Sequence, residues 1–398
     1  MGRQRGEALD ARRPDVQGGG VSPMTVAATA PMDRLLAARQ RLIRSPRFRQ
    51  WAAKFPLTRG IARRHARAAF DLTAGFVYSQ VLLACVRLRL LEILGERPQT
   101  APVLARRLAL PVAAVERLLA ATAALGLSVR QGGDRHGLGD VGAAVVGEPA
   151  ILAMVEHNAL LYADLADPVA LLRGETGGTR LSAYWGYAGD AHPDALRADQ
   201  VAGYSTLMAA SQPLIAGEVL SAYSFARHRC VLDVGGGEGA FLCAVGERHP
   251  ALRLLHFDLP AVAERARARF TAAGLDARAV VSAGDFLRDP LPAGADVAAL
   301  VRVVHDHDDA AVLALLRNVR RALPSGGVLL IAEPMAGVPG VEPVADAYFG
   351  FYLLAMGQGR ARTFADLARL VAQAGFGPAQ ALPTAMPLQT SLLAATAT

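Results

Sequence analysis

The pattern of hydrophobic positions changes near residue 230 of this 398-residue chain. Before that point apolar residues recur at helical spacing, whereas after it short apolar runs alternate with amphipathic segments. The runs predict strands at residues 230–234, 252–257, 279–282, 296–300 and 327–332, with helices between them. Strands that alternate with helices indicate an α/β fold with a parallel sheet. Residues 375–377 and 389–394 are expected to add a terminal antiparallel hairpin.

The region before the sheet contains a second module. Residues 68–147 are predicted to form three helices and a two-stranded ribbon, the order of a winged helix. Its first segment, 70–86, is apolar nearly all the way round and needs a cover that a second subunit provides. The helix expected to read DNA, 112–125, carries only Glu116 and Arg117 as charges. Because phosphate binding needs several cations on one face, we interpret the module as a dimerisation domain and predict no nucleic-acid partner.

Residues 148–228 are predicted to be helices that link this module to an α/β domain at 229–398. Bulky side chains are frequent in the linking helices and are candidates to line an apolar pocket, although aromatic residues at helical spacing more often belong to a core. They are Met154, His157, Tyr162, Tyr184, Trp185, Tyr187, Tyr204 and Met208.

The net charge of +7 is concentrated at the N-terminus. Residues 1–70 hold 15 of the 42 Lys and Arg residues and 4 of the 35 Asp and Glu residues, so this part carries +11 and the rest −4. Residues 1–31 have the composition of a disordered tail. Residues 32–67 predict a basic amphipathic helix that breaks at Pro56. This arm either packs on the protein itself or contacts an anionic membrane, and both interpretations stay open.

Features of the whole chain bear on its location. No apolar run reaches the length of about 18 residues that a spanning helix needs, and the N-terminus lacks a hydrophobic signal core. The three cysteines are isolated, without the spacing of a metal site or a redox pair. We therefore predict a cytoplasmic protein, peripheral to the inner membrane if the arm contacts lipid.

A glycine-rich turn follows the first predicted strand of the sheet. Residues 231–239 read VLDVGGGEG, in which Gly235, Gly237 and Gly239 let a ligand lie against bare backbone amides at a helix N-terminus. The chain has a single lysine, so a Walker-type phosphate loop is excluded. An acid inside the strand, Asp233, opposes a pyrophosphate but suits a cationic amino group, as in S-adenosylmethionine. Asp258, about 20 residues on, ends the next strand and is expected to accept hydrogen bonds from the ribose hydroxyls.

Further polar residues follow the later strands, at the edge of the sheet where ligands bind in open α/β folds. Asp285 and Phe286 are candidates to contact an adenine ring, and Arg302 is expected to join the cofactor-binding residues. Residues 305–309 read HDHDD, and His305 is the first of them after an apolar strand.

Histidine suits a methyl transfer to oxygen because the imidazole takes a hydroxyl proton near neutral pH. Asp306 and Glu333 are expected to orient the ring of His305, which would face the pocket. A metal site or a solvated helix cap is the alternative interpretation of the HDHDD cluster, but consecutive side chains diverge and we predict no metal.

Taken together, these motifs resemble the class I S-adenosylmethionine-dependent O-methyltransferases of the plant caffeate and bacterial polyketide type. The resemblance covers residues 65–395 and implies a Rossmann-like sheet, a winged-helix dimerisation domain, a homodimer, His305 as general base and Glu333 as a flanking acid. Its landmarks are LDVGGGEG at 232–239, FDLP at 257–260, GDF at 284–286, HDHDD at 305–309, LPSGGVLLIAEP at 323–334 and RTFADLARLVAQAGF at 362–376. The chain departs from the family where His307, Ala361 and Val301 replace a common tryptophan, acid and lysine.

The N-terminal part narrows the resemblance. The segment FDLTAGFVYSQVL at 70–82 and the basic arm before it are similar to the hydroxyneurosporene O-methyltransferases of purple bacteria. This similarity implies that the acceptor is the tertiary hydroxyl of a 1-hydroxycarotenoid on the way to spheroidene or spirilloxanthin. The alternatives are an aromatic polyketide, another small molecule or a bacteriochlorophyllide as acceptor, and a winged-helix regulator that senses S-adenosylmethionine without chemistry.

Overall fold

The computed structural model describes residues 31–186 and 198–398. The tail expected for residues 1–31 lies outside the described residues except for Pro31. The chain divides into two compact units, residues 1–77 and 78–398.

The described part of the first unit is helical. Its elements are α1 (Pro31–Arg44), α2 (Pro46–Lys54) and the beginning of α3 (Arg59–Arg87). The predicted break at Pro56 is confirmed, since no helix covers residues 55–58. A second break, which the pattern did not predict, falls at Ser45, whose hydroxyl accepts a hydrogen bond from the Phe48 amide at 3.4 Å and caps α2. Pro46 explains this break because proline has no N–H to continue the preceding helix.

The expected boundary between residues 67 and 68 falls inside α3. The sequence changes there from basic to apolar, but such a change does not interrupt a helix unless a residue that breaks it is present. By length and composition α3 is also apolar enough to cross a membrane, which the sequence analysis did not expect because Asp71 and other polar residues interrupt its apolar run. Only 11% of its most apolar window is buried.

The second unit begins with the predicted winged-helix module, which is confirmed. Its elements are α4 (Leu90–Glu96), β1 (Gln99–Thr100), α5 (Ala101–Leu108), α6 (Val112–Ala124), β2 (Ser128–Gln131) and β3 (Arg135–Leu138). The three strands pair antiparallel in the order β1-β3-β2. Leu90, Leu94, Leu104 and Leu119 are buried between the helices and form the centre of its core.

Helices follow as predicted between this module and the sheet. They are α7 (Asp140–Val146), α8 (Pro149–Asp164), α9 (Pro168–Leu172), α10 (Arg180–Tyr184) and α11 (Ala198–Ala222). The expected domain boundaries at 147/148 and 228/229 fall between elements.

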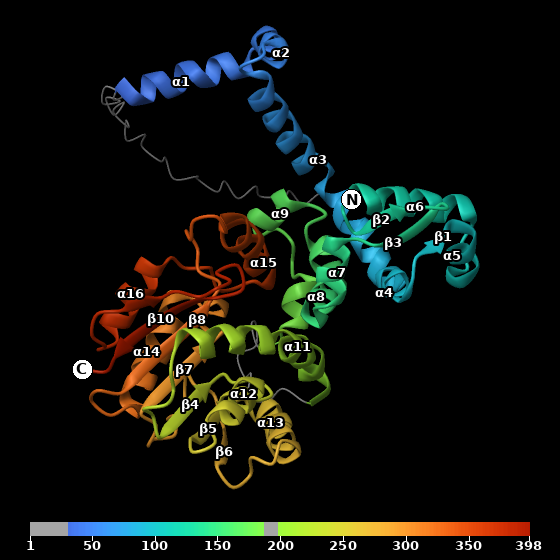
Figure 1. Ribbon diagram of the computed structural model, residues 1–398. Helices are drawn as coiled ribbons and strands as arrows, with labels where there is room; N and C mark the ends of the chain where they lie inside the picture. The colour runs from blue at the N-terminus through green and yellow to red at the C-terminus, as the bar shows by residue number, and fades with distance from the viewer. Residues whose placement is uncertain (1–30, 187–197) are drawn as a thin grey trace, which may run out of the picture. The chain divides into compact units, whose positions relative to one another are not determined.

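The C-terminal domain is built on a seven-stranded sheet with the order β6-β5-β4-β7-β8-β10-β9 (Figure 1). The strands are β4 (Cys230–Val234), β5 (Arg253–Asp258), β6 (Ala279–Ala283), β7 (Val297–Val301), β8 (Val328–Glu333), β9 (Gln380–Leu382) and β10 (Ser391–Thr396). The first five are parallel, as predicted, because helices connect them.

The terminal pair, β9 and β10, is antiparallel, but the prediction that its first strand lies at 375–377 is wrong. Gly375 has a φ of 91° and ends the preceding helix, so Phe376 makes only an isolated bridge to Ala397.

Helices cover both faces of the sheet (Figure 1). Besides α11 they are α12 (Ala240–Arg248), α13 (Pro260–Ala272), α14 (Asp309–Ala322) and α16 (Phe364–Gln373). A further helix, α15 (Phe349–Met356), packs against α8, α9 and α10. α14 and α16 pack on one face, and α11, α12 and α13 pack on the other. Successive side chains of a strand point to opposite faces, so Leu232 belongs to the first of the two cores and Val231 to the second. A strand buried on both sides must be apolar throughout, which explains the continuous apolar runs of the sequence.

The loop after β7, residues 302–308, is held by the buried side chain of Arg362. Its guanidinium donates hydrogen bonds to the carbonyls of Val304 at 2.8 Å and His307 at 2.6 Å, and to the carboxylate of Asp309 at 2.9 Å. The side chain of Arg362 is 1% exposed. A buried cation must find such acceptors, and in doing so it ties the loop to the start of α16.

We predict that Arg362→Met lowers the free energy of unfolding by about 2–4 kcal/mol, because the buried carbonyl of Val304 and the partly buried carbonyl of His307 lose their donor. Arg360→Met is the matched control: it removes an ion pair with the same Asp309, but from a half-exposed position, and should cost under about 1 kcal/mol. Urea unfolding monitored by circular dichroism measures both variants. Equal losses would contradict the role given to burial.

Candidate active site

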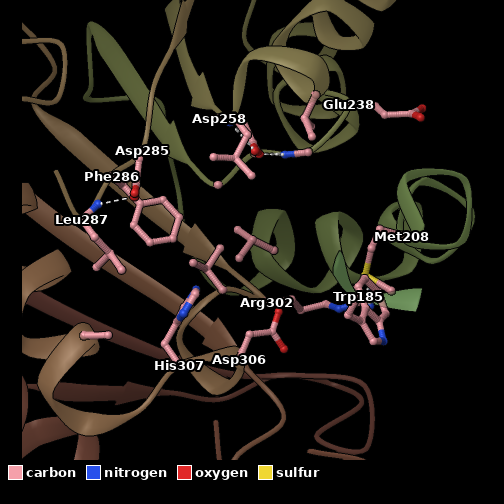
Figure 2. A pocket seen from close by; sticks show the side chains of 18 of the residues that line it. Trp185, Met208, Glu238, Asp258, Asp285, Phe286, Leu287, Arg302, Asp306 and His307 are labelled. Atoms are coloured by element: carbon pink, nitrogen blue, oxygen red, sulfur yellow. Dashed lines mark hydrogen bonds between the residues drawn. The ribbon is translucent and has the colours of Figure 1, made fainter. Parts of the chain in front are cut away.

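A cavity of about 350 Å³ lies at the carboxyl edge of the parallel strands. From β4 the chain continues to β5 and β6 on one side of the sheet and then crosses to β7 on the other side of β4. Open α/β sheets bind ligands at such a point, where the strand order reverses. Figure 2 shows the side chains of the cavity in two groups. Asp258, Asp285 and Phe286 lie at one end, and Trp185, Met208, Arg302 and Asp306 at the other.

The glycine loop forms one wall, as the sequence predicts, through Gly235 and Gly237. Both have positive φ, 67° and 58°, which glycine adopts without strain. A Cβ on Gly235 would lie 2.8 Å from the side chain of Val303, so that position cannot carry a larger residue without a shift. The result is a stretch of bare backbone at the cavity surface.

The carboxylate of Asp258 braces this loop. It accepts hydrogen bonds at 2.7 Å from the amides of Gly237 and Leu259, and the residue lines the cavity. Burial raises the pKa of Asp258 to about 6, against the two amide hydrogen bonds, which lower it. Asp258 is therefore mainly ionised at neutral pH and protonated in mild acid.

Asp285 and Phe286 lie in the cavity wall after β6. The Asp285 carboxylate accepts a hydrogen bond from the Leu287 amide at 2.9 Å, and its backbone amide donates to Asp289 at 2.8 Å. These bonds fix a turn that presents the ring of Phe286 to the cavity.

Two residues expected to contact the cofactor do not line the cavity. Asp233 lies beneath the loop, where a Cβ on Gly236 would be 2.5 Å from its Oδ2. Neither of its carboxylate oxygens has a hydrogen-bond partner, and burial, with the charge of Asp258, raises the pKa of Asp233 to about 8. Gly239 has a φ of 77° and begins α12, and a Cβ there would be 2.5 Å from the ring of Phe270. Both positions shape the loop from below, because their side of it faces the core.

His305, Asp306 and Glu333 come together as the sequence predicts, but not in the expected orientation. Nδ1 of His305 contacts the carboxylate of Glu333, and Nε2 lies 3.2 Å from Oδ1 of Asp306. The ring is buried and does not line the cavity, whereas Asp306 does. Burial alone lowers the pKa of His305, but the charges of Asp306 and Glu333 outweigh it and raise the pKa. The site therefore favours an imidazolium behind a carboxylate.

Arg302 lines the end of the cavity near Asp306 (Figure 2). Its φ of 59° is unusual for a residue with a side chain and costs about 1–3 kcal/mol. The backbone stays in place because the Arg302 amide donates to the Ala332 carbonyl at 2.9 Å. The guanidinium donates to Oγ of Ser211 at 2.5 Å and to the sulfur of Met208 at 2.7 Å, so it is tied to α11 rather than to the glycine loop.

Of the bulky residues in 148–228, Trp185 and Met208 line the cavity. The indole N–H of Trp185 donates to the hydroxyl of Tyr352 at 2.7 Å, and this hydroxyl also lies 2.6 Å from Nε2 of His157. Burial lowers the pKa of His157 to about 4, so its ring is neutral. His157 does not line the cavity, and it supports the wall through its contact with the hydroxyl of Tyr352. Tyr187 and the side chain of Tyr204 lie outside the described part of the chain.

Sequence reasoning missed two residues of the site. The first is His307, which lines the cavity and meets the ring of Phe286 edge to face at 5.4 Å between centroids. Burial lowers the pKa of His307 and favours a neutral ring. Its position in the HDHDD cluster was the available signal. The second is Arg362, which holds the loop that carries Asp306 and His307. The only signal for it in the sequence was its position at the start of the family landmark at 362–376.

The alternative interpretation of HDHDD as a metal site finds no geometric support in residues 31–186 and 198–398. No group of three or more His, Cys, Asp or Glu side chains there could hold a metal ion.

Comparisons with known proteins agree with this geometry. The model of the O-methyltransferase domain matches residues 162–377, and that of the O-methyltransferase dimerisation domain matches residues 70–144. The chain belongs to the family of S-adenosylmethionine-dependent O-methyltransferases. The dimerisation domain supports a homodimer.

Two relatives are similar over nearly their whole length. The demethylspheroidene O-methyltransferase of Cereibacter sphaeroides is 44% identical over 89% of this chain and 93% of its own. The enzyme of the same name from Rhodobacter capsulatus is 41% identical, with 89% and 88% covered. Among solved structures, the calicheamicin-biosynthesis methyltransferase CalO1 in its SAH-bound form has a TM-score of 0.71 at 27% identity, covering 84% of this chain and 98% of that one.

The residues of the cavity fit S-adenosylmethionine. The backbone surface at Gly235 and Gly237, which has no side chains, lets a ligand approach closely, and the carboxylates of Asp258 and Asp285 and the ring of Phe286 match the polar groups and the flat base of a nucleoside without phosphate. No lysine is available to hold a phosphate, since the single lysine, Lys54, lies in α2.

We predict that S-adenosylhomocysteine binds about five- to tenfold more tightly at pH 7 than at pH 5, because we expect the Asp258 carboxylate to accept the ribose hydroxyls and this carboxylate is protonated below its pKa of about 6. Asp258→Asn should weaken binding at pH 7 by at least about tenfold and remove the pH dependence. Isothermal titration calorimetry measures both effects.

Asp233→Asn is the matched control, because it replaces the other buried carboxyl beside the loop, which is already mostly protonated at pH 7, by a neutral amide of the same shape. Its affinity for S-adenosylhomocysteine should stay within about threefold of the parent. A large loss in this variant alone would assign cofactor contact to Asp233, as the sequence analysis expected.

Proposed function

We propose that this enzyme methylates the tertiary hydroxyl of a 1-hydroxycarotenoid in carotenoid biosynthesis. The observation that carries the proposal is the similarity, over about nine-tenths of both chains, to an enzyme named demethylspheroidene O-methyltransferase. An enzyme of the same name from a second organism is similar over the same share of this chain.

The wall of the cavity supports an apolar acceptor. Trp185 and Met208 lie at the same end of the cavity as Asp306, and Val301 also lines the cavity (Figure 2). An apolar wall gains free energy from each hydrocarbon group that it removes from water. A few polar groups, Arg302, Gln212 and Gln358, remain to orient a hydroxyl.

For the cofactor we propose that Gly235, Gly237 and Asp258 hold the methionine and ribose parts, and that Asp285, Phe286 and His307 hold the adenine. When bound, S-adenosylmethionine supplies a methyl group that an oxygen nucleophile can attack. The protein contributes by aligning the two reactants, an effect that accounts for several kcal/mol of a barrier.

We propose that the carboxylate of Asp306 accepts the proton of the acceptor's hydroxyl group. A tertiary alcohol is a very weak acid, so its O–H bond breaks as or after the O–CH₃ bond forms and the S–CH₃ bond breaks. At that stage the oxygen is strongly acidic, and a carboxylate is a sufficient base. Asp306 lines the cavity and His305 does not, so the imidazolium of His305 acts from behind by holding Asp306 in place.

An acceptor of this kind partitions into a bilayer rather than into water, because each buried CH₂ is worth about 0.8 kcal/mol. We therefore propose that the enzyme works at a membrane surface.

We predict that the purified enzyme transfers labelled methyl groups from S-adenosylmethionine to 1-hydroxyneurosporene in detergent. A dihydroxynaphthoate and a bacteriochlorophyllide should be methylated at least about a hundredfold more slowly, because a flat acceptor leaves part of the apolar cavity wall uncovered. Radiolabel in the extracted carotenoid is the measurement. Faster methylation of either alternative acceptor would sink the proposal on substrate.

We also predict that Asp306→Asn lowers kcat by about 100-fold or more, whereas His305→Gln lowers it by about tenfold. Both variants should bind S-adenosylhomocysteine within about threefold of the parent, which shows that the fold and cofactor site are intact. Single-turnover rates measure the chemical step. If His305→Gln has the larger effect, the proton goes to the imidazole as the family resemblance implies.

A further inference from the structure

We infer that residues 31–67, called the basic arm below, form a docking surface for an anionic lipid bilayer. The inference extends the proposed function. It rests on that function for the statement that the acceptor is apolar and reaches the enzyme from a bilayer. The arm consists of α1, α2 and the first part of α3.

The arm exposes large apolar side chains that a protein normally buries. Leu35 is 66% exposed, Trp51 51% and Leu57 83%. The others are Met32, Leu36, Leu42, Phe55 and Ile61. Single exposed apolar residues are ordinary, but eight within 30 residues of chain mark a binding surface.

The apolar and basic residues of α1 are separated around its axis. At 100° per residue, Met32, Leu35, Leu36 and Leu42 fall within one sector about 120° wide, with Arg39 among them. The remaining arginines, Arg34, Arg41 and Arg44, face the other side. A helix of this kind lies in the plane of a membrane surface, with its apolar side among the acyl chains and its arginines beside the lipid phosphates.

An aromatic cluster continues the surface on α2. The ring of Trp51 stacks on Phe55 at 4.9 Å and meets Phe48 at 5.7 Å. Arg47, Arg49 and Lys54 lie on the same short helix. Tryptophan next to cations is favoured at the headgroup level, where its ring body is apolar and its N–H can reach water.

The net charge of the arm indicates which kind of partner covers its exposed apolar side chains. Residues 31–67 contain 11 Lys and Arg residues and one acid, Asp33, so they carry +10. Two copies of such an arm repel each other, which disfavours pairing of one arm with another. Nucleic acid satisfies the charge but offers no acyl phase for the leucines. An anionic bilayer satisfies both the charge and the apolar side chains.

Vesicle flotation of the full chain tests the inference. With vesicles of phosphatidylcholine and phosphatidylglycerol, the protein should float, and with phosphatidylcholine alone the bound fraction should fall at least about tenfold. Arg34→Glu/Arg41→Glu/Arg44→Glu should abolish the difference. Leu35→Ser/Leu42→Ser should weaken binding to both kinds of vesicle, because it removes inserted apolar area.

Arg173→Glu/Arg227→Glu/Arg248→Glu is the matched control. It makes the same change of net charge at exposed positions outside the arm, and its flotation should match that of the parent. If this variant loses binding as strongly as the arm variant, net charge alone is responsible and the inference fails. The inference also fails if the arm variants change the oligomeric state in analytical ultracentrifugation and leave flotation unchanged, because the arm then covers a second copy.

Tryptophan fluorescence gives a readout at the arm itself. The chain has two tryptophans, Trp51 in the arm and the buried Trp185. Anionic vesicles should shift the emission to the blue and protect it from iodide, and Trp51→Phe should remove the shift while flotation persists. An unchanged shift in Trp51→Phe would place the contact elsewhere.

These outcomes are separable from the proposed function. The charge variant should keep the parent's turnover of a detergent-dispersed acceptor and lose turnover of the same acceptor supplied in anionic vesicles. Vesicle binding without methylation of any hydroxycarotenoid would refute the proposed acceptor and leave the arm's role intact.

Discussion

The site depends on one buried carboxylate, that of Glu333 at the end of β8. It accepts hydrogen bonds from the backbone amides of Val303 and Val304 and contacts Nδ1 of His305. A charge almost wholly removed from water must be compensated, so this carboxylate draws the loop after β7 into a single arrangement. Arg362 satisfies the carbonyls of the same loop from its other side. The carboxylate of Glu333 accepts hydrogen bonds from the loop on one side, and the guanidinium of Arg362 donates hydrogen bonds to it on the other. Together they fix the positions at which Asp306 and His307 line the cavity.

The two acids beside the glycine loop show how burial decides a role. Asp233 and Asp258 belong to neighbouring parallel strands, β4 and β5, but Asp233 is buried, whereas Asp258 is partly exposed. Asp258 ends its strand, receives two amide hydrogen bonds and faces the cavity. Asp233 stands one residue before the end of its strand and points beneath the loop, where it has no partner. Its proton is retained near neutral pH because ionisation there would leave an uncompensated charge.

The proposed membrane contact and the cavity belong to parts of the chain that differ in charge and polarity. The basic arm combines a net charge of +10 with eight exposed large apolar side chains, whereas the residues after position 70 carry a net −4. The body therefore has no general attraction to an anionic surface, and the arm alone carries it. An enzyme whose acceptor is proposed to be an insoluble hydrocarbon benefits from an arm that is attracted to a lipid surface.

Several features of this protein follow from local sequence rules. The parallel strands were predictable because strands covered on both faces must be apolar throughout, and the glycine turn because positive φ and a bare ligand surface both require glycine. The presence of His305, Asp306 and Glu333 at one edge follows from the parallel topology, which brings the carboxyl ends of β7 and β8 together.

Only the tertiary structure decided which of these side chains meets the cavity. Whether Asp306 or His305 faces the acceptor depends on where Glu333 and Arg362 pull the loop, and both lie many residues away in the chain. Asp233 turned out to lie beneath the loop, because the direction of a side chain at a strand end is set by the neighbouring strands. Orientation is a property of the packed neighbours, and the spacing of residues along a chain contains little information about it.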